Sequence, residues 1–207
     1  MRNMTFVKIC GLRSAEDALA ASQAHPDCAG MILSEGFRRS VSIPAAREIS
    51  AALSKDIPLC GVFVNEKAED IVPFVKEGLI DRIQLHGQEP AELVDELHAW
   101  LPGVQVIKAM EIHSLNDVIE AEAYPADLLL LDGGKGEGKE FDWDYLKDFR
   151  RPYILAGGLT AENVQKAILL LHPFGVDASS GVETEGKKDA EKMKAFVKAV
   201  RDMEESA

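Results

Sequence analysis

The sequence predicts an α/β fold, a single-domain (β/α)8 TIM barrel that spans residues 1–207. Three observations support this prediction: short apolar runs recur at regular spacing, the segments between them carry helix signals, and the runs are almost continuously apolar. Continuous apolar runs are typical of parallel strands that are buried on both faces. The sequence contains no linker or low-complexity tract that would mark a second domain.

The apolar runs form the expected strands. Successive run ends are 22 to 31 residues apart, which suits a strand, a short loop and a helix in each unit. The expected strand ends are Cys10, Leu33, Val64, His86, Met110, Asp132, Gly157 and Ser179. A doubly wound open sheet is the alternative, but it usually has fewer strands and often carries a nucleotide fingerprint after the first one. The segment CGLRSAED lacks that fingerprint.

The segments between the runs predict helices. Ser14 with Asp17 resembles a capping box, and Thr160 is placed to cap the helix that follows it. Pro73 inside an otherwise helical segment implies a kink or a shorter helix there. Two apolar stripes at helical spacing predict faces that pack on the core. One stripe consists of Leu93, Val94, Leu97 and Leu101, and the other of Met193, Phe196, Val197 and Val200.

Composition and charge narrow the functional classes. A net charge of -12 disfavours nucleic acid and anionic membrane surfaces as partners, and no apolar run approaches membrane-spanning length. The N-terminus shows no signal-peptide pattern, and the three cysteines lack paired spacing, so we expect a cytoplasmic protein. The five histidines form no HxxxH or HxH pair, so no metal site is expected.

The glycine-rich segment after the sixth run raises the alternative of a nucleotide site. Residues 128–143 read LLLLDGGKGEGKEFDW, in which GGKGEGK fits the start of a P-loop. A P-loop needs a Ser or Thr hydroxyl next, to hold Mg²⁺, and Glu140 occupies that position. We therefore interpret this segment as a strand that ends in Asp132, followed by a Gly-rich surface loop that leads to a helix from Trp143.

Polar residues at strand ends are the candidates for chemistry, because such barrels carry their catalytic groups there. Cys10 and Asp132 are the best candidates for proton transfer. A thiolate can act as a base where positive charge lowers its pKa, and a carboxylic acid can donate where an apolar site raises its pKa. The alternatives are a small buried hydrophobe for Cys10 and a loop cap for Asp132. For Cys28 and Cys60 the buried role is expected.

Two segments near the end of the chain predict an anion site. AGGLTAENV places Gly157 and Gly158 at a strand end before a helix, and DASSGVE places Ser179, Ser180 and Gly181 at the next strand end. Glycines let backbone N–H groups approach an oxyanion, serines add donors, and barrels often bind phosphate after strands seven and eight. The alternative is two Gly-rich turns that only connect elements.

Three further residues are candidates for substrate contacts. Arg38 and Arg39 in GFRRSVS are either a solvated surface pair or an anchor for a substrate carboxylate. His86 ends a strand and is either a substrate ligand or a histidine satisfied by its local hydrogen bonds.

The chain resembles a known family, the phosphoribosylanthranilate isomerases of tryptophan biosynthesis. The similar stretches, in the family's order and approximate spacing, are VKICGL, RRSVS, GVFVNE, IQLHGQE, LLLLD, GKEFDW, ILAGGLTAENV and VDASSGVE, and they cover essentially the whole chain. The resemblance implies a (β/α)8 barrel without metal or cofactor. It also implies an Amadori rearrangement of N-(5-phosphoribosyl)anthranilate to 1-(2-carboxyphenylamino)-1-deoxyribulose 5-phosphate.

The resemblance implies roles for individual residues. The family's catalytic cysteine falls on Cys10, and its general-acid aspartate falls on Asp132. The arginine that meets the anthranilate carboxylate falls on Arg39, with the adjacent Arg38 as the alternative. The phosphate-binding segments fall on the two predicted anion-binding segments. Lys8 is expected to help keep Cys10 ionised.

Functions of other classes stay open. Another sugar-phosphate isomerase or epimerase could use the same barrel, and a barrel that binds phosphate without turnover could serve as a partner or sensor protein. Metal-dependent epimerases need a ligand set that the lone His86 does not supply, and Cys10 with Asp132 argues against a non-catalytic protein. A phosphorylated aminosugar is the expected small-molecule partner, and the sequence leaves open whether the chain acts as a monomer or a homodimer.

Overall fold

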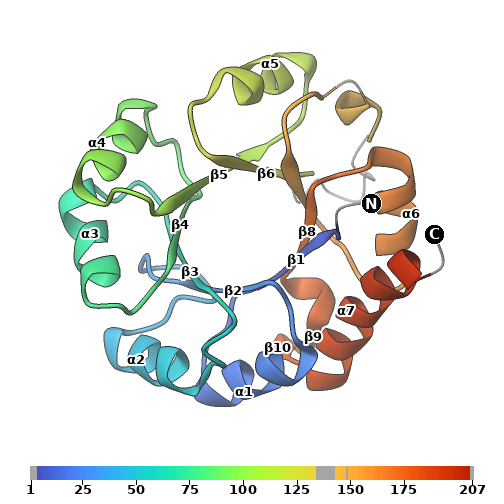
Figure 1. Cartoon of the computed structure of the whole chain (residues 1–207), viewed down its shortest axis with the longest axis horizontal. Helices are drawn as coiled ribbons and strands as arrows, with labels where there is room; N and C mark the ends of the chain where they lie inside the picture. The colour runs from blue at the N-terminus through green and yellow to red at the C-terminus, as the bar shows by residue number, and fades with distance from the viewer. Residues whose placement is uncertain (1–3, 134–142, 148, 206–207) are drawn as a thin grey trace.

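The computed structural model describes residues 4–133, 143–147 and 149–205. Its centre is a closed barrel of parallel strands in the order β1 to β8, with helices around the outside (Figure 1), which confirms the predicted barrel. The strands are β1 Phe6–Cys10, β2 Cys28–Ile32, β3 Leu59–Phe63, β4 Arg82–Leu85, β5 Gln105–Glu111, β6 Leu128–Asp132, β7 Tyr153–Ala156 and β8 Gly175–Ala178. Each predicted strand end lies within one residue of the observed end.

Helices of the described residues follow every strand except one. They are α1 Ala15–Ala24, α2 Ile43–Ala52, α3 Ala68–Lys76, α4 Glu92–Trp100, α5 Leu115–Ala123, α6 Val164–Leu171 and α7 Ala190–Glu205. After β6, the described residues form only the short 3-10 helix η1 Trp143–Leu146, so the α-helix predicted from Trp143 is wrong. The segment from Trp143 to Tyr153 is too short for a helix of several turns and the return to the barrel. The glycine-rich stretch 134–142 lies outside the described residues, and the loop predicted there stays a prediction.

The two predicted helix caps differ in outcome. Ser14 Oγ accepts a hydrogen bond from the backbone N–H of Asp17 at 3.1 Å, which confirms the predicted cap of α1. Thr160 does not cap α6, because its Oγ1 accepts from the N–H of Glu162 at 3.3 Å in a preceding turn. The helix itself begins at Val164.

Pro73, where we expected a kink or a shorter helix, lies inside α3, whose nine residues match the length of α4 and α5. Proline removes the hydrogen bond that would reach the carbonyl of Glu69. Both residues are exposed, and water can satisfy that carbonyl. None of the described helices combines the length and the apolar character needed to cross a membrane.

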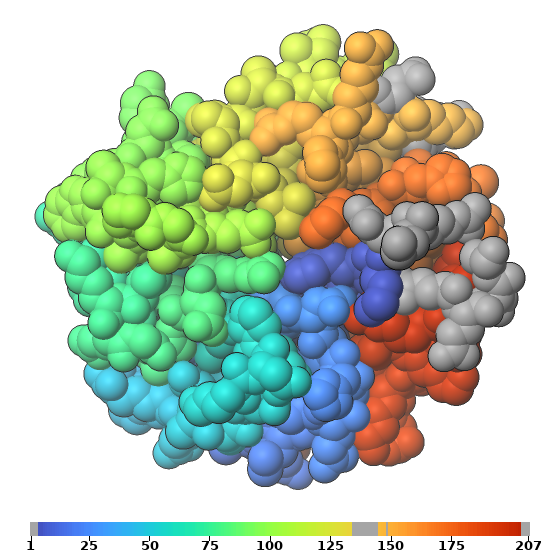
Figure 2. Space-filling model, in the orientation of Figure 1, coloured from blue at the N-terminus to red at the C-terminus, as the bar shows by residue number. Residues whose placement is uncertain are grey.

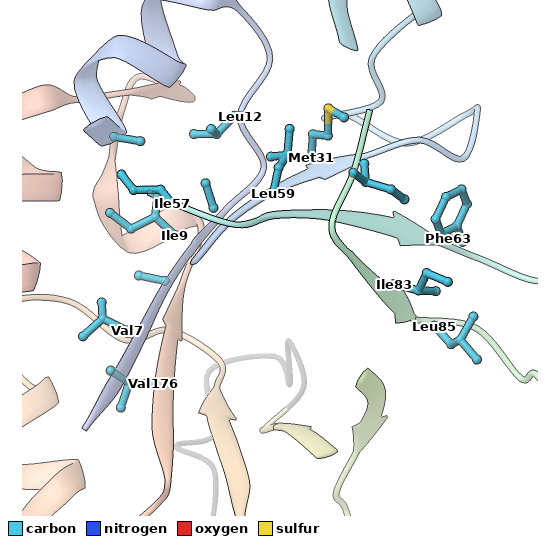
Figure 3. Packing of buried hydrophobic residues seen from close by; sticks show 14 of the residues in the cluster. Val7, Ile9, Leu12, Met31, Ile57, Leu59, Phe63, Ile83, Leu85 and Val176 are labelled. Carbon is cyan, nitrogen blue, oxygen red and sulfur yellow. The ribbon is translucent and has the colours of Figure 1, made fainter. Parts of the chain in front are cut away.

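Two hydrophobic cores lie on the two sides of the barrel wall. The outer core fills the space between strands and helices, with residues such as Val7, Ile9 and Val176 (Figure 3). Both predicted stripes, along α4 and α7, are buried in this layer. The inner core fills the barrel, so the ring that looks open as a ribbon is packed with side chains (Figure 2). Its buried residues are Cys28, Cys60, Ile107, Ala109, Leu128, Leu130, Ile154 and Ala156.

Three aspartates fasten neighbouring strands at the amino-terminal face of the barrel. Each directly precedes an even-numbered strand and accepts a hydrogen bond from a backbone N–H of the odd-numbered strand before it. The pairs are Asp27 with Val7 (2.7 Å), Asp81 with Leu59 (2.8 Å) and Asp127 with Val106 (2.7 Å). These carboxylates satisfy backbone donors at the starts of the odd-numbered strands.

We expect Asp81→Ala to lower the free energy of unfolding by about 1–3 kcal/mol, because it removes the acceptor of the N–H of buried Leu59. Asp81→Asn keeps an oxygen in the same place and should cost less. Urea unfolding followed by circular dichroism measures both variants. Equal losses would assign the effect to the charge of Asp81 and not to its hydrogen bond.

Candidate active site

Strand alternation points the two proton-transfer candidates into the barrel. On β1, Val7 and Ile9 belong to the outer core, so Cys10 lies on the inner face. On β6, Leu130 belongs to the inner core, so Asp132 lies on the inner face as well. Both residues end their strands, and β7 and β8 lie between these strands in the barrel order. The structure therefore brings both to the same carboxyl-terminal mouth.

Cys10 is buried, with 7% of its surface exposed, and it fills a space left by a glycine. A Cβ at Gly30 of β2 would lie 2.9 Å from Cys10 Sγ and 3.4 Å from Lys8 Nζ. Burial raises the pKa of the Cys10 thiol above its usual 9.0, although the ammonium groups of Lys8 and Lys188 act in the opposite direction. Lys8 thus favours the Cys10 thiolate, as expected, but burial outweighs its charge and the net shift of the Cys10 pKa is upward.

Lys8 is itself paired inside the barrel. Its Nζ lies 2.9 Å from Oδ1 of Asp177 on β8, and the two side chains are 0% and 10% exposed. Burial disfavours the ammonium, but the Asp177 carboxylate prevails and raises the pKa of Lys8 well above its usual value. A fixed positive charge thus lies near Cys10, and the Asp177 carboxylate offsets part of its effect on the thiol.

Asp132 lies against the loop that follows β7. A Cβ at Gly157 would lie 2.8 Å from Asp132 Oδ1 and 2.9 Å from the backbone nitrogen of Gly133. Gly157 also has a φ of 96°, a conformation that residues with a Cβ rarely adopt. Position 157 therefore requires glycine both for its backbone conformation and for the space that the Asp132 carboxylate occupies.

His86 directly follows β4 and carries a neutral ring. Its Nδ1 lies 2.9 Å from Nε2 of the buried Gln84. With the Gln84 amide in this orientation, Nδ1 accepts and the ring proton lies on Nε2, while Gln84 Oε1 is buried without a hydrogen-bond partner among the described residues. Burial lowers the pKa of His86 below its usual 6.5, against the opposing effect of the Asp132 carboxylate. The ring can therefore offer one N–H donor to a bound molecule.

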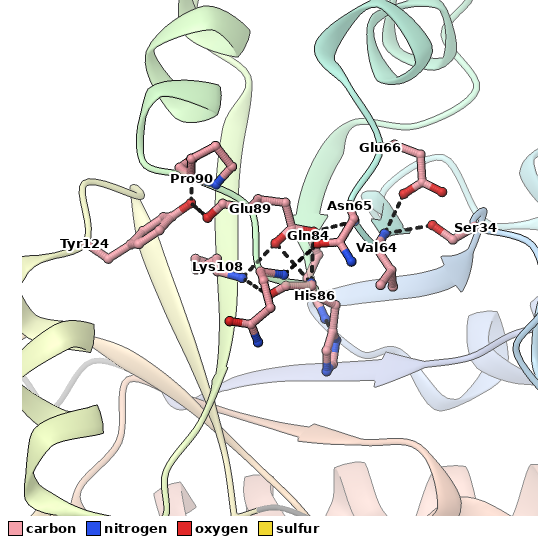
Figure 4. Close-up of polar contacts among 12 residues, drawn as sticks. Ser34, Val64, Asn65, Glu66, Gln84, His86, Glu89, Pro90, Lys108 and Tyr124 are labelled. Atoms are coloured by element: carbon pink, nitrogen blue, oxygen red, sulfur yellow. Dashed lines mark hydrogen bonds and ion pairs between the residues drawn. The ribbon is translucent and has the colours of Figure 1, made fainter.

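A hydrogen-bond network holds the loops after β3 and β4 in place (Figure 4). Glu89 Oε1 accepts from the N–H groups of Asn65 and Gly87, each at 2.9 Å. Lys108 Nζ lies 2.7 Å from Glu89 Oε2 and donates to the Gly87 carbonyl at 2.6 Å. The Lys108 and Glu89 side chains are only 4% and 1% exposed. This pair therefore has a structural role, which is to fix the loop that begins with His86.

The two predicted anion-binding segments meet at the mouth. A Cβ at Gly181 would lie 1.8 Å from the carbonyl oxygen of Leu159, so the loops after β7 and β8 pack backbone against backbone. Gly157 and Gly158 are both exposed. Ser179 follows β8, and Ser180 begins the short 3-10 helix η2 Ser180–Val182. α6 begins several residues after the glycines. An anion on this side would therefore meet N–H groups of the loop backbone and not the N-terminus of a helix.

Arg39 lies at the mouth and is already paired with a carboxylate. A Cβ at Gly11 would lie 2.7 Å from Arg39 Cδ and 3.1 Å from Ser179 Oγ, so the loops after β1, β2 and β8 touch here. Arg39 donates to both carboxylate oxygens of Glu183, at 2.6 and 3.0 Å. Arg38 donates to the same carboxylate at 2.8 Å, but its side chain is 56% exposed against 11% for Arg39. Arg39 is therefore no solvated surface residue.

Sequence reasoning missed Glu183 and Lys188 as parts of this mouth. They lie on a two-stranded hairpin, β9 Glu183–Thr184 and β10 Lys187–Lys188, whose two turn residues have positive φ. Lys188 Nζ lies 3.1 Å from Glu183 Oε1, and its side chain is 1% exposed. The available signal was ETEGKK, in which a glycine after a polar residue indicates a tight turn between two short strands.

This arrangement suits acid–base chemistry on a small anionic molecule. A thiol and a carboxylate end two strands of one mouth, and the glycine-containing loops follow the strands between them. Arg39 and the neutral His86 add hydrogen-bond donors on other sides. Within the described ranges, His, Cys, Asp and Glu side chains form no cluster of three or more that could hold a metal ion.

Comparisons with known proteins point to one family. The family model for N-(5'-phosphoribosyl)anthranilate (PRA) isomerase matches residues 7–199. The N-(5'-phosphoribosyl)anthranilate isomerase of Caldanaerobacter subterraneus subsp. tengcongensis is 41% identical over 205 residues, covering 96% of this chain and 98% of that protein.

Solved structures agree with the sequence comparison. Phosphoribosyl anthranilate isomerase from Thermotoga maritima has a TM-score of 0.86 and 38% identity to this chain. A phosphoribosyl anthranilate isomerase in complex with reduced 1-(o-carboxyphenylamino)-1-deoxyribulose 5-phosphate has a TM-score of 0.85 and 37% identity. Each comparison covers 96% of this chain and 100% of the other.

We expect the rate of Cys10 alkylation by iodoacetamide to rise with pH through a midpoint above 9.0, because the thiolate reacts and burial raises the pKa of this thiol. Cys28 and Cys60 are 0% exposed and should contribute little, and Cys10→Ser identifies the reacting residue. Mass spectrometry of timed samples measures the rates. A midpoint well below 9.0 would show that positive charge, and not burial, dominates at Cys10.

Proposed function

The chain belongs to the N-(5'-phosphoribosyl)anthranilate isomerase family, and we propose that Cys10 and Asp132 carry out the family's reaction at the mouth of this barrel. The reaction converts N-(5'-phosphoribosyl)anthranilate into 1-(2-carboxyphenylamino)-1-deoxyribulose 5-phosphate. It is an aldose–ketose isomerisation of tryptophan biosynthesis, and it needs one acid and one base on a substrate that carries a phosphate and a carboxylate.

One observation carries this proposal: the barrel order β6, β7, β8, β1. Asp132 ends β6 and Cys10 ends β1, while the predicted phosphate-binding loops follow the two strands between them. A substrate whose phosphate is held by these loops would have its sugar carbons within reach of both the acid and the base. Such positioning accounts for much of the rate enhancement of an enzyme that holds its reacting groups in place.

Asp132 acts in the first step. As a carboxylic acid it gives its proton to the furanose ring oxygen, and the bond between that oxygen and C1 breaks. The lone pair of the anthranilate nitrogen forms the C1–N double bond, so the ring opens to a Schiff base. His86, as a neutral Nε2–H donor, is proposed to hydrogen-bond the substrate on this side.

Cys10 acts in the second step. Its thiolate removes the proton from C2, and the electrons of that bond form a C1–C2 double bond while the C1–N π electrons return to nitrogen. The resulting enolamine tautomerises to the ketone. Each proton transfer contributes roughly 10²–10⁴-fold to the rate.

The raised pKa of Cys10 has two opposing effects on this step. Less of the thiol is ionised at neutral pH, but each thiolate that forms is a stronger base. Lys8 limits the first effect, because its charge favours the thiolate. The rate of the second step should therefore rise with pH toward the alkaline range.

Two anchors hold the substrate in this proposal. The phosphate contacts the loops that contain Gly157, Gly158, Ser179, Ser180 and Gly181. The anthranilate carboxylate contacts Arg39, which the hairpin holds at the mouth. Charge-assisted pairs of this kind fix orientation as well as affinity.

The proposed setting is a cytoplasmic enzyme that takes a small phosphorylated aminosugar and no nucleic acid or membrane surface. The net charge of -12 supports this choice of partner. A related isomerase from Thermotoga maritima is described as dimeric, which supports testing the homodimer beside the monomer for this chain.

We expect Cys10→Ala and Asp132→Asn each to lower kcat by about 10²–10⁴-fold while the substrate still binds, because each removes one proton-transfer group. The substrate is generated in situ, and the loss of its anthranilate fluorescence measures turnover in the presence of EDTA. Near-wild-type turnover in either variant would remove that residue from the mechanism. A folded wild-type protein without turnover would contradict the proposed function itself.

Gly157→Ala should lower kcat by at least about tenfold, because its Cβ would lie 2.8 Å from Asp132 Oδ1 and would force the carboxylate to shift. Gly158→Ala is the matched control: its backbone is also left-handed, but nothing lies within 4 Å of the new Cβ. Both changes keep the backbone N–H groups. The fluorescence assay compares them, and equal activity of the two variants would show that contact with Asp132 does not matter.

A further inference from the structure

Glu183 binds one edge of the Arg39 guanidinium. Nε donates to Oε1 at 2.6 Å and Nη2 donates to Oε2 at 3.0 Å, the parallel pairing of two planar groups. This pairing uses two of the five N–H donors of the guanidinium. The edge formed by Nη1 and the second N–H of Nη2 remains, and it has the right geometry for a second carboxylate.

The Arg39–Glu183 pair is buried, and its carboxylate stays ionised. The side chains of Glu183 and Arg39 are 5% and 11% exposed. Burial disfavours the Glu183 carboxylate, but its bonds with Arg39 and Lys188 prevail and lower the pKa of Glu183 to about 2. The carboxylate therefore stays ionised, and the pair stays formed, at any pH near neutrality.

Glu183 is in turn held from two further sides. Lys188 Nζ lies 3.1 Å from Glu183 Oε1 and donates to the Ser179 carbonyl at 2.7 Å. Lys192 Nζ donates to the backbone carbonyl of Glu183 at 2.8 Å. The carboxylate that orients Arg39 is thus tied to the loop that follows β8, where the phosphate is proposed to bind.

We propose that Glu183 is a positioning residue for substrate recognition, which holds Arg39 so that its Nη1/Nη2 edge meets the substrate carboxylate. The inference rests on the proposed function, in which Arg39 contacts that carboxylate. Glu183 touches no substrate atom and acts through Arg39. An arginine already fixed in this way loses little side-chain freedom when the substrate binds.

The charges around Glu183 favour the binding of a second carboxylate beside Arg39. Arg38, Arg39 and Lys188 all pair with Glu183, so these four residues carry more positive than negative charge. The substrate carboxylate therefore enters a positive field, although a carboxylate already occupies one edge of the guanidinium. The aliphatic part of Arg39 packs beside Gly11, in the loop that follows β1.

The test compares two stable ligands, the reduced product analogue and the same molecule without its 2-carboxyl group. Isothermal titration calorimetry measures both affinities in wild type and in Glu183→Gln. We expect the variant to bind the carboxylated analogue about tenfold more weakly and the other analogue within about twofold of wild type. In turnover assays KM should rise by a similar factor, with a smaller change in kcat.

Two further variants separate positioning from simple structural damage. Glu77→Gln breaks the exposed 2.7 Å pair between Arg47 and Glu77 and makes the same chemical change, so both affinities should stay as in wild type. In an Arg39→Met background, Glu183→Gln should cause no additional loss for the carboxylated analogue, because the residue it positions is absent.

Several outcomes would overturn the proposal. They are an equal loss for both analogues, an additional loss in the Arg39→Met background, or no loss at all in Glu183→Gln. If wild type binds both analogues equally, the carboxylate role of Arg39 in the proposed function fails, and the positioning role fails with it. Should Glu183→Gln not fold, Glu183→Asp replaces it: the shortened carboxylate shifts the guanidinium, and the same selective loss is required.

Discussion

The pairing of β8 with β1 closes the barrel, and the active site depends on that closure. Phe6 lies opposite Gly175 in this pair, and a Cβ at position 175 would lie 2.7 Å from the Phe6 carbonyl oxygen. A residue without a side chain therefore allows the last strand to reach the first. The same register places Lys8 opposite Asp177, so closure also forms the ion pair that lies beneath Cys10. Without this strand pairing, Cys10 and the proposed phosphate-binding loops would not lie at the same end of the barrel.

Much of the fold could be predicted because its sequence signal is local. Strands of a parallel barrel are buried on both faces, so the apolar runs mark them to within one residue. The helix expected from Trp143 failed for a reason of geometry, since a helix signal says nothing about the length available before the next strand. Cys28 and Cys60 do lie in the buried inner core, as expected from their positions near strand starts.

The electrostatics of the site could not be predicted, because they depend on distances between segments far apart in the chain. Arg39 and Glu183 are 144 residues apart in sequence, and only the fold shows that they pair. The pKa of Cys10 depends on how burial compares with the charge of Lys8, and a sequence shows the charge but not the burial. Glycines posed the same difficulty, since the space that Gly157 leaves for Asp132 is visible only in three dimensions.

The three aspartates of the amino-terminal face divide the barrel into pairs of strands. Each aspartate joins two strands that are neighbours in sequence: β1 with β2, β3 with β4, and β5 with β6. Each of these hydrogen bonds therefore has its donor and its acceptor within one contiguous two-strand unit, which is a quarter of the barrel. A circular permutant whose new ends lie between two such pairs of strands keeps each aspartate and its backbone donor close in sequence. New ends within a pair would place the aspartate and its donor near opposite termini. The turns that lead from α2 into β3 and from α4 into β5 can therefore accept new chain ends without separating such a pair of strands or cutting the loops that carry Arg39 and His86.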